Sequence, residues 1–372
     1  MRILVFITVA VALAYPASGQ NCTCESNFEW LKKTFEENDA GFQYIIDKKG
    51  QAAYDAHNQL TFGKITSAKT LPECAVLLQE WLQFFRSLHI GIQLLTDDKM
   101  PVSQNRREVV EEKIDSPEYE HYINSKNAQN PYLETLNSTT LYLRIPSFDG
   151  RHKKSIDDVL LANKEKILST ENLIIDLRNN GGGSDVSFDE LLPFLYTNPV
   201  RKIEALFLST TLNNQRMLEL INNAEQYGLD EKLKQWAQQS YDKLEKHLGE
   251  FINLEDEDIT IDRRDTIYTY PKNIGIIIHE RNGSTTENFL LAARQSKKVK
   301  LFGTTTVGAL DISNMYWAIS PCEEIALIYG LSKSLRIPDM AIDGIGVQPD
   351  YYLDKTIPQY KWVEFVNEIL NQ

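Results

Sequence analysis

The sequence predicts an α/β protein with a small helical domain at its N-terminus. From residue 28 to about 95, apolar residues recur at spacings of three and four, which is typical of amphipathic helices. An alternating strand at 140–146, a helix at 156–168 and an apolar strand at 173–177 then follow in close order. A strand, helix and strand at this spacing form a crossover unit, which places the two strands parallel.

Later segments continue the α/β pattern and divide the chain into regions. Another buried strand at 274–278 leads into a helix at Ser284, and two short strands follow at 299–302 and 325–329. We expect the following segments in chain order: a signal peptide at 1–19, a helical N-terminal domain at 20–96, a polar connecting insertion at 97–138, a main domain at 139–356 with a helical insertion at 213–256, and a C-terminal helix at 357–372.

The N-terminus has the pattern of a secretory signal. Arg2 precedes an apolar run that is too short to span a bilayer permanently, and small residues lead to a cleavage point near Gly19. No later stretch approaches membrane-spanning length. We therefore expect an extracytoplasmic protein, secreted or periplasmic, without a membrane span.

Charge and cysteine content agree with that compartment. The net charge of −13 excludes nucleic acid as a partner, because such proteins need clustered basic residues. The four cysteines are Cys22, Cys24, Cys74 and Cys322, an even number suited to disulfides in an oxidising environment. A Cys22–Cys24 bridge would close a very small ring, so we expect each of these two to reach Cys74 or Cys322, in either order. No Cys/His group has zinc-site spacing.

The apolar strand at 173–177 ends in a polar pair and three glycines, Gly181 to Gly183. Glycines allow backbone N–H groups to turn outward without a Cβ in the way, so the loop can bind an anion or a developing oxyanion. The alternative is a turn that is merely rich in glycine, because the segment is neither a dinucleotide fingerprint nor a phosphate loop.

Ser284 lies where a buried strand turns into a helix, a place where free N–H groups favour negative charge on a nucleophile. The same residues form a capping-box pattern with Glu287, which is the structural alternative. Of the six histidines, His89 ends a helix and His279 ends the strand before Ser284, so these two are the candidates for a base. A structural role is the alternative for each.

Four ordered motifs resemble the C-terminal processing, or tail-specific, peptidases, a family that includes the tricorn core protease. They are Asp-Leu-Arg-Asn-Asn-Gly-Gly-Gly at 176–183, Gly-Ser-Thr-Thr-Glu at 283–287, Gly-Thr-Thr-Thr-Val-Gly at 303–308 and Gly-Val-Gln-Pro-Asp at 346–350. The resemblance implies a crotonase-like spiral of βαβ units, a serine peptidase activity on peptides or unfolded proteins, and no metal or organic cofactor. The insertion at 97–138 is too short and polar for a PDZ module.

One departure selects the branch of the family. The tail-specific branch places a catalytic lysine just after the third motif, where this chain has Ala309. The resemblance to the tricorn-like branch implies Ser284 as nucleophile, His89 as base and Asp343 as the acid that orients it. Glu287 is an alternative orienter.

The same resemblance implies an oxyanion hole formed by the N–H of Thr285 and that of Gly181 or Gly182. The alternative function is a catalytically inactive family member that binds peptides or lipids outside the cell. An acyl-CoA enzyme of the crotonase type fits the fold but not the signal peptide.

Overall fold

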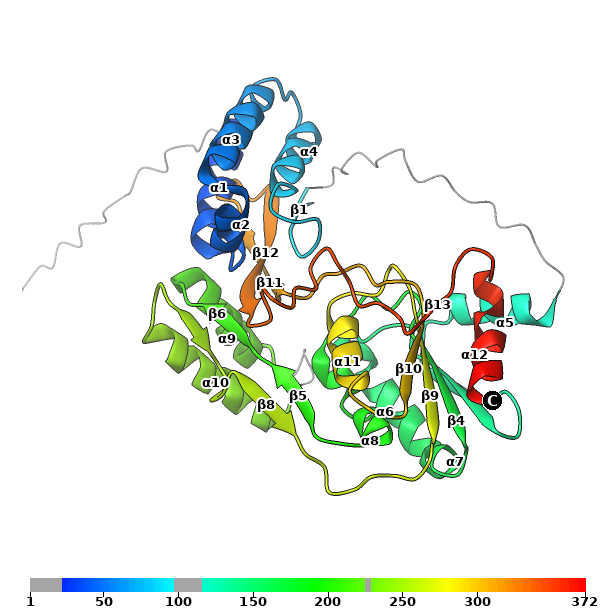
Figure 1. Ribbon diagram of the computed structural model, residues 1–372. Helices are drawn as coiled ribbons and strands as arrows, with labels where there is room; N and C mark the ends of the chain where they lie inside the picture. The colour runs from blue at the N-terminus through cyan, green and yellow to red at the C-terminus, as the bar shows by residue number, and fades with distance from the viewer. Residues whose placement is uncertain (1–21, 97–115, 225–228) are drawn as a thin grey trace, which may run out of the picture.

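The computed structural model describes residues 22–96, 116–224 and 229–372. The predicted signal peptide at 1–19 lies outside the described residues, as does much of the predicted insertion at 97–138. The predicted α/β class with a helical N-terminal region is confirmed (Figure 1). Within the described ranges, no helix is long and apolar enough to cross a membrane.

A six-stranded sheet forms the centre of the main domain, in the order β13-β10-β9-β4-β3-β2. All neighbours in it are parallel except the pair β2·β3 at one edge. The bounds of its strands are β2 Tyr132–Thr135, β3 Thr140–Arg144, β4 Asn172–Asp176, β9 Asn273–Ile278, β10 Val299–Gly303 and β13 Tyr351–Tyr352. The predicted parallel pairing of the strands at 140–146 and 173–177 is confirmed.

Helices cover both faces of this sheet, which explains why its strands are apolar on both sides. Leu173 and Ile175 of β4 pack with the helices of one face, whereas Ile174 packs with the C-terminal helix on the other. The covering helices are α6 Lys153–Ala162, α7 Lys164–Ile167, α8 Leu192–Leu195 and α11 Thr285–Ala293 on the first face, and α12 Trp362–Leu370 on the second, with α5 Pro117–Asn127 beside it. The helix at α11 begins at the predicted place.

A second, antiparallel sheet runs in the order β1-β12-β6-β7, and β11 also pairs with β12. Its strands are β1 Gly91–Leu94, β6 Ala205–Leu208, β7 Phe251–Asn253, β11 Ile312–Ile319 and β12 Ile325–Ser334. The N-terminal helices, α1 Cys24–Asn38, α2 Phe42–Lys49, α3 Gln51–Ile65 and α4 Leu71–Leu82, share a hydrophobic core with β1, β11 and β12. Figure 1 shows them together at the top of the molecule.

An outer arm completes the fold. It contains the helices α9 Thr211–Asn222 and α10 Glu231–Glu245, which pack on each other, and a two-stranded ribbon of β5 Val200–Ile203 and β8 Ile259–Asp262. The segment at 213–256, which the sequence predicts as a helical insertion, contains most of α9, all of α10 and, near its end, the strand β7. The ribbon is antiparallel and belongs to neither large sheet.

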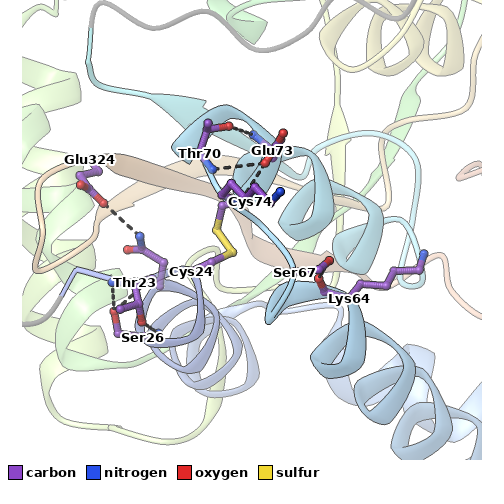
Figure 2. The surroundings of a disulfide bond; sticks show 11 residues. Thr23, Cys24, Ser26, Lys64, Ser67, Thr70, Glu73, Cys74 and Glu324 are labelled. Carbon is purple, nitrogen blue, oxygen red and sulfur yellow. Dashed lines mark hydrogen bonds between the residues drawn. A yellow bond between two sulfur atoms is a disulfide. The ribbon is translucent and has the colours of Figure 1, made fainter.

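Two disulfides fasten the N-terminal region, Cys22–Cys322 and Cys24–Cys74. The prediction that Cys22 and Cys24 each bond to one of the distant cysteines is confirmed, and the structure shows which cysteine pairs with which. Figure 2 shows the bridge from α1 to α4, with a capping box at the start of each helix, Thr23 with Ser26 and Thr70 with Glu73. The first bridge ties the start of α1 to the turn before β12.

Candidate active site

Ser284 lies at the junction between the end of β9 and the start of α11. Its backbone has φ 56° and ψ −127°, a conformation that L-residues rarely adopt, and its side chain makes no capping hydrogen bond. The capping-box alternative for Ser284 and Glu287 is therefore wrong. A non-glycine residue at such angles costs about 1–3 kcal/mol, and residues of this kind concentrate at functional sites.

Glu287 is fully buried. Its carboxylate accepts hydrogen bonds from the Thr306 hydroxyl, from Gly308 N at 2.7 Å and from Ala309 N at 2.8 Å. Burial raises the pKa of Glu287, and these donors partly offset that rise. In return, the carbonyl of Ala309 accepts the N–H of Ser284 at 2.9 Å. The first turn of α11 is thus fixed to the segment after β10.

The three glycines that follow β4 pack directly against Ser284. A Cβ on Gly182 would lie 2.9 Å from the Ser284 Cβ and 2.9 Å from Thr285 N, and Gly182 has φ +103°. Only glycine fits a backbone in this position. The predicted anion-binding loop of Gly181 to Gly183, which we call the glycine cradle, and the predicted nucleophile are therefore neighbours in space.

Buried amide groups hold the cradle to the serine turn. The Asn180 side chain accepts hydrogen bonds from Gly182 N and from the Thr286 hydroxyl, and Asn282 donates to the carbonyls of Leu177 and Asn180. Among the hydrogen bonds of the described residues, neither Gly181 N–H nor Thr285 N–H has an acceptor. Both belong to the predicted oxyanion hole, whereas the Gly182 N–H is already used at 3.1 Å.

A buried ion pair lies below the cradle at the ends of β3 and β4. Arg178 binds the Asp176 carboxylate, and Arg144 donates to the carbonyls of Asp176 and Arg178 at 2.9 and 2.7 Å. Burial alone would raise the pKa of Asp176, but Arg178 and Arg144 outweigh it and hold that pKa well below its usual range. The strand ends that carry the cradle are therefore tied together by charge-assisted hydrogen bonds.

His89 lies just before β1, beside the core that the N-terminal helices share with β1, β11 and β12. It too has a positive φ, of 55°, and its Nδ1 lies 2.8 Å from the carbonyl oxygen of Ile312. Arg86 pairs with the buried Asp39 and donates to the His89 carbonyl at 2.9 Å, which fixes the backbone at this position. Burial lowers the pKa of His89, with Arg86 adding to that effect, while the Ile312 carbonyl and Asp343 act to raise it.

Asp343 binds main-chain amides. Its carboxylate accepts N–H groups from Leu310 at 2.6 Å, from Asp311 at 2.7 Å and from Ile312 at 3.2 Å. No hydrogen bond in the described part of the chain joins it to His89, although its charge acts on the imidazole. Asp311 makes the reciprocal contact, accepting Asp343 N at 2.8 Å.

The segment Gly308–Ile312 therefore connects the candidate residues. Its backbone binds Glu287 and Ser284 at one end, Asp343 in the middle and His89 at the other. Three residues of chain span at most about 10 Å. The contacts of Ser284 and His89 thus lie on one short stretch, which we call the bridging segment.

The other candidate base, His279, has a structural position. Its buried ring contacts Asn179 at 3.1 Å and accepts the N–H of Arg281 at 3.3 Å, so it ties the turn after β9 to the cradle. Burial lowers the pKa of His279. Asn179 is a third non-glycine residue of the site with positive φ, at 64°.

Sequence reasoning missed Asn180, Asp311 and the Ile312 carbonyl. Asn180 lies inside the glycine motif, so its place in that motif could have identified it as a residue of the site. A main-chain carbonyl has no signature in the sequence. Within the described ranges, the one group of side chains close enough to hold a metal ion is Cys22, Cys322 and Glu324, and its two cysteines are joined in a disulfide.

Comparison with known proteins gives the family. The sequence pattern of peptidase family S41 matches residues 139–353, which include the glycine cradle, Ser284 and Asp343. The match spans more than half of the chain, so the chain belongs to peptidase family S41. The predicted resemblance to the C-terminal processing peptidases is confirmed. The comparison with curated proteins found no match.

Solved structures share the fold at low sequence identity. Mature CPAF in complex with lactacystin is 14% identical with a TM-score of 0.63, over 93% of this chain and 98% of that chain. A candidate peptidase from Parabacteroides merdae is 14% identical with a TM-score of 0.56, over 95% and 98%. A lipoprotein from Streptococcus agalactiae is 15% identical with a TM-score of 0.51, over 98% and 99%. The common fold thus extends beyond the matched region to nearly the whole chain.

Proposed function

We propose that the protein is an extracytoplasmic serine endopeptidase that cleaves peptides or unfolded proteins, with Ser284 as nucleophile and His89 as general base. The observation that carries the proposal is the strained Ser284 packed against the glycine cradle and followed by the Thr285 N–H, which has no acceptor among the hydrogen bonds of the described residues. Membership of a peptidase family supports the reaction class. Two disulfides and the predicted signal peptide support the compartment.

The proposed mechanism begins at the imidazole. With Nδ1–H donated to the Ile312 carbonyl, the neutral ring of His89 keeps its lone pair on Nε2. Nε2 removes the proton of Ser284 Oγ as this oxygen attacks the scissile carbonyl, and later returns the proton to the leaving amine. Water then hydrolyses the acyl-enzyme by the same route.

The oxyanion is the second element of the mechanism. The N–H groups of Gly181 and Thr285 stabilise the charge on the tetrahedral intermediate, at about 3 kcal/mol per donor. Thr285 contributes at the N-terminus of α11, where the helix dipole favours the same charge. The buried ion pair of Asp176 and Arg178 keeps the cradle in place.

Asp343 acts in this proposal as a positioning residue. Its carboxylate holds the N–H of Ile312, and the carbonyl of the same residue receives Nδ1–H of His89. The acid therefore orients the imidazole through the main chain. Glu287 does the corresponding work for Ser284, because it fixes the amides beside the carbonyl that binds Ser284 N.

The test is cleavage of a reduced, carboxymethylated protein substrate, followed by mass spectrometry. We expect Ser284→Ala to abolish cleavage and His89→Ala to slow it by about 10²- to 10⁴-fold. Ser169→Ala, on an exposed turn, is the matched control and should cleave at the wild-type rate. Equal cleavage by Ser284→Ala and the wild type would refute the nucleophile. No cleavage by any form would favour the inactive, peptide- or lipid-binding alternative.

A further inference from the structure

A cavity of about 510 Å³ lies between α11, β5 and β8, outside the residues assigned to catalysis. Its volume is within the range of about 300–1,000 Å³ that ligand pockets occupy. The apolar part of its lining is formed by Val186, Phe188, Leu192, Leu291, Ala292 and Ile342. The cavity therefore offers space and an apolar surface for one or more side chains.

Four ionic side chains on the cavity walls have an ion-pair partner, either in the lining or just outside it. Arg264 binds Asp262 at 2.9 Å, and Arg336 binds Asp311 at 3.2 Å. Lys202 lies 3.5 Å from Glu204. Asp185, Asp189 and Arg201 also line the cavity and form no ion pair within the described residues. The lining favours an apolar occupant because most of its surface is apolar.

The cavity continues from the candidate nucleophile along one face of α11. Ser284, Asn288, Leu291 and Gln295 are spaced by four, three and four residues, which places them in a row on a helix. The last three line the cavity. α11 ends at Ala293, and Gln295 lies in the turn just after it. At the rise of a helix, the row from Ser284 to Gln295 is about 16 Å long, the length of roughly five residues of extended chain.

The edge strand β5 faces this row with free backbone groups. Val200, Lys202 and Glu204 are in the hydrogen-bonding positions toward β8, as the bond from Glu204 N to Asp258 O shows. Arg201 and Ile203 therefore point their N–H and C=O groups to the opposite edge. Among the hydrogen bonds of the described residues, those of Ile203 have no partner.

The Gln295 side chain shows what this edge accepts. Its amide oxygen receives Arg201 N at 2.9 Å and its amide nitrogen donates to Arg201 O at 2.8 Å, as a neighbouring strand would do. The next position, Ile203, lies toward the catalytic end. Asp185 accepts a hydrogen bond from Asn288, which lies one turn after Ser284. Desolvation raises the pKa of Asp185, and the charges of Lys202 and Glu204, the residues on either side of Ile203, also act on its carboxylate.

We propose that an extended segment of the peptide substrate adds to β5 as a third strand at Ile203 and places an apolar side chain, such as Leu, Met or Phe, in this cavity. The inference rests on the proposed function, because it gives the substrate of that site a binding mode and a specificity. Backbone pairing explains how unfolded chains of varied sequence can bind, and the cavity explains a preference among them. A folded segment cannot present its backbone in this way.

The experiment measures binding, so that it does not depend on turnover. Fluorescein-labelled, carboxymethylated insulin B chain is titrated against the Ser284→Ala protein, and binding is followed by anisotropy. We expect saturable binding, and Ala292→Phe in the same background should weaken it at least tenfold by filling the cavity. Ala162→Phe, the same substitution on an exposed helix position, is the control and should leave binding within twofold.

A second measurement isolates the strand pairing. B chains with a single backbone N-methyl group lose one N–H donor and cannot approach an edge strand closely. We expect methylation to weaken binding at alternate residues within one stretch. The absence of binding, or binding that ignores both Ala292→Phe and the methyl groups, would overturn the inference. Binding with these dependences but without cleavage by the wild type would instead refute only the proposed function.

Discussion

Ser284 and His89 come from two regions that are built differently. Ser284 follows a parallel strand whose neighbours and covering helices lie in one core, formed by sequential strand–helix units. His89 lies beside an antiparallel sheet whose core with the N-terminal helices joins residues near 30, 90 and 330, and this region carries both disulfides. We call them the serine half and the histidine half.

The difference shows where the geometry of the site is decided. Neither core contains both residues, so neither can set the distance between nucleophile and base alone. The bridging segment Gly308–Ile312 runs from β10 of the serine half into β11 of the histidine half. Glu287 and Asp343 hold it by its amides, and we infer that these two carboxylates set the alignment of the two halves at the site.

The largest expected loss of activity comes from a substitution within the serine half. Gly182→Ala places a methyl group 2.8 Å from the Gly283 carbonyl and 2.9 Å from Thr285 N, at a φ of +103°. We expect a loss of about 10²- to 10³-fold in kcat, comparable to removal of an oxyanion donor. Gly63→Ala is the matched control, because Gly63 is exposed on α3 and no atom lies within 4 Å of its Cβ. Equal activity of the two variants would show that the cradle does not serve the reaction.

The serine half was also the more predictable one from sequence. Its strands are short apolar runs, its helices follow directly, and the glycines at 181–183 mark a strand end, so that local patterns determined most of it. These patterns also predicted its parallel strand order and the position of Ser284. They could not predict the contacts between Gly182 and Ser284, because these residues are about 100 positions apart in the sequence.

The histidine half could be predicted only in part. Its helices showed clear periodicity, but β11 was missed because polar residues such as Ser313 and Asn314 interrupt its apolar pattern. The hydrogen-bond partner of His89 could not be predicted from the sequence for a different reason. It is the main-chain oxygen of Ile312, and any residue there would supply the same atom. Asp343 was chosen from the resemblance, and that choice stays a prediction, now with contacts to the main chain.

Asp343→Asn tests whether the bridging segment aligns the two halves. Its amide group cannot accept all three N–H donors, and its NH₂ would face the N–H of Ile312 or Leu310. We expect kcat/KM to fall by about 10- to 100-fold through a shift of His89, since a misplacement of ~1 Å can cost that much. Asp339→Asn, at an exposed position four residues earlier, should have no effect.

The alignment has a separate readout. A reactive fluorophosphonate labels an activated serine, so its labelling rate should fall in Asp343→Asn in proportion to kcat/KM. If Asp343→Asn is labelled and cleaves substrate at the same rates as the wild type, the proposed role of the acid is contradicted.

A smaller effect on activity is expected from the Cys24–Cys74 disulfide, which lies in the histidine half (Figure 2). It closes a separation of 50 residues, and its removal by a double Cys→Ser change should cost about 4 kcal/mol of the free energy of unfolding. Hydrogen exchange should rise in α1–α4 and remain slow in β4 and β9. Equal loss of protection in both sheets would show that the two halves unfold as one unit.

The smallest expected effect is a shift of the pH profile, and it has a definite sign. Burial lowers the pKa of His89 from its ordinary value near 6.5, and the base works in its neutral form, so activity is complete above the lowered pKa and falls as the pH drops through it. The acid limb of kcat/KM should therefore lie below about pH 6.5. Asp343 acts to raise the pKa of His89, so Asp343→Asn should move this limb to still lower pH while reducing the plateau. Arg86 acts in the opposite direction, and Asp339→Asn should leave the limb in place. A limb that moves upward in Asp343→Asn would mean that the titrating group is not His89, because loss of a negative charge can only make an imidazolium less stable.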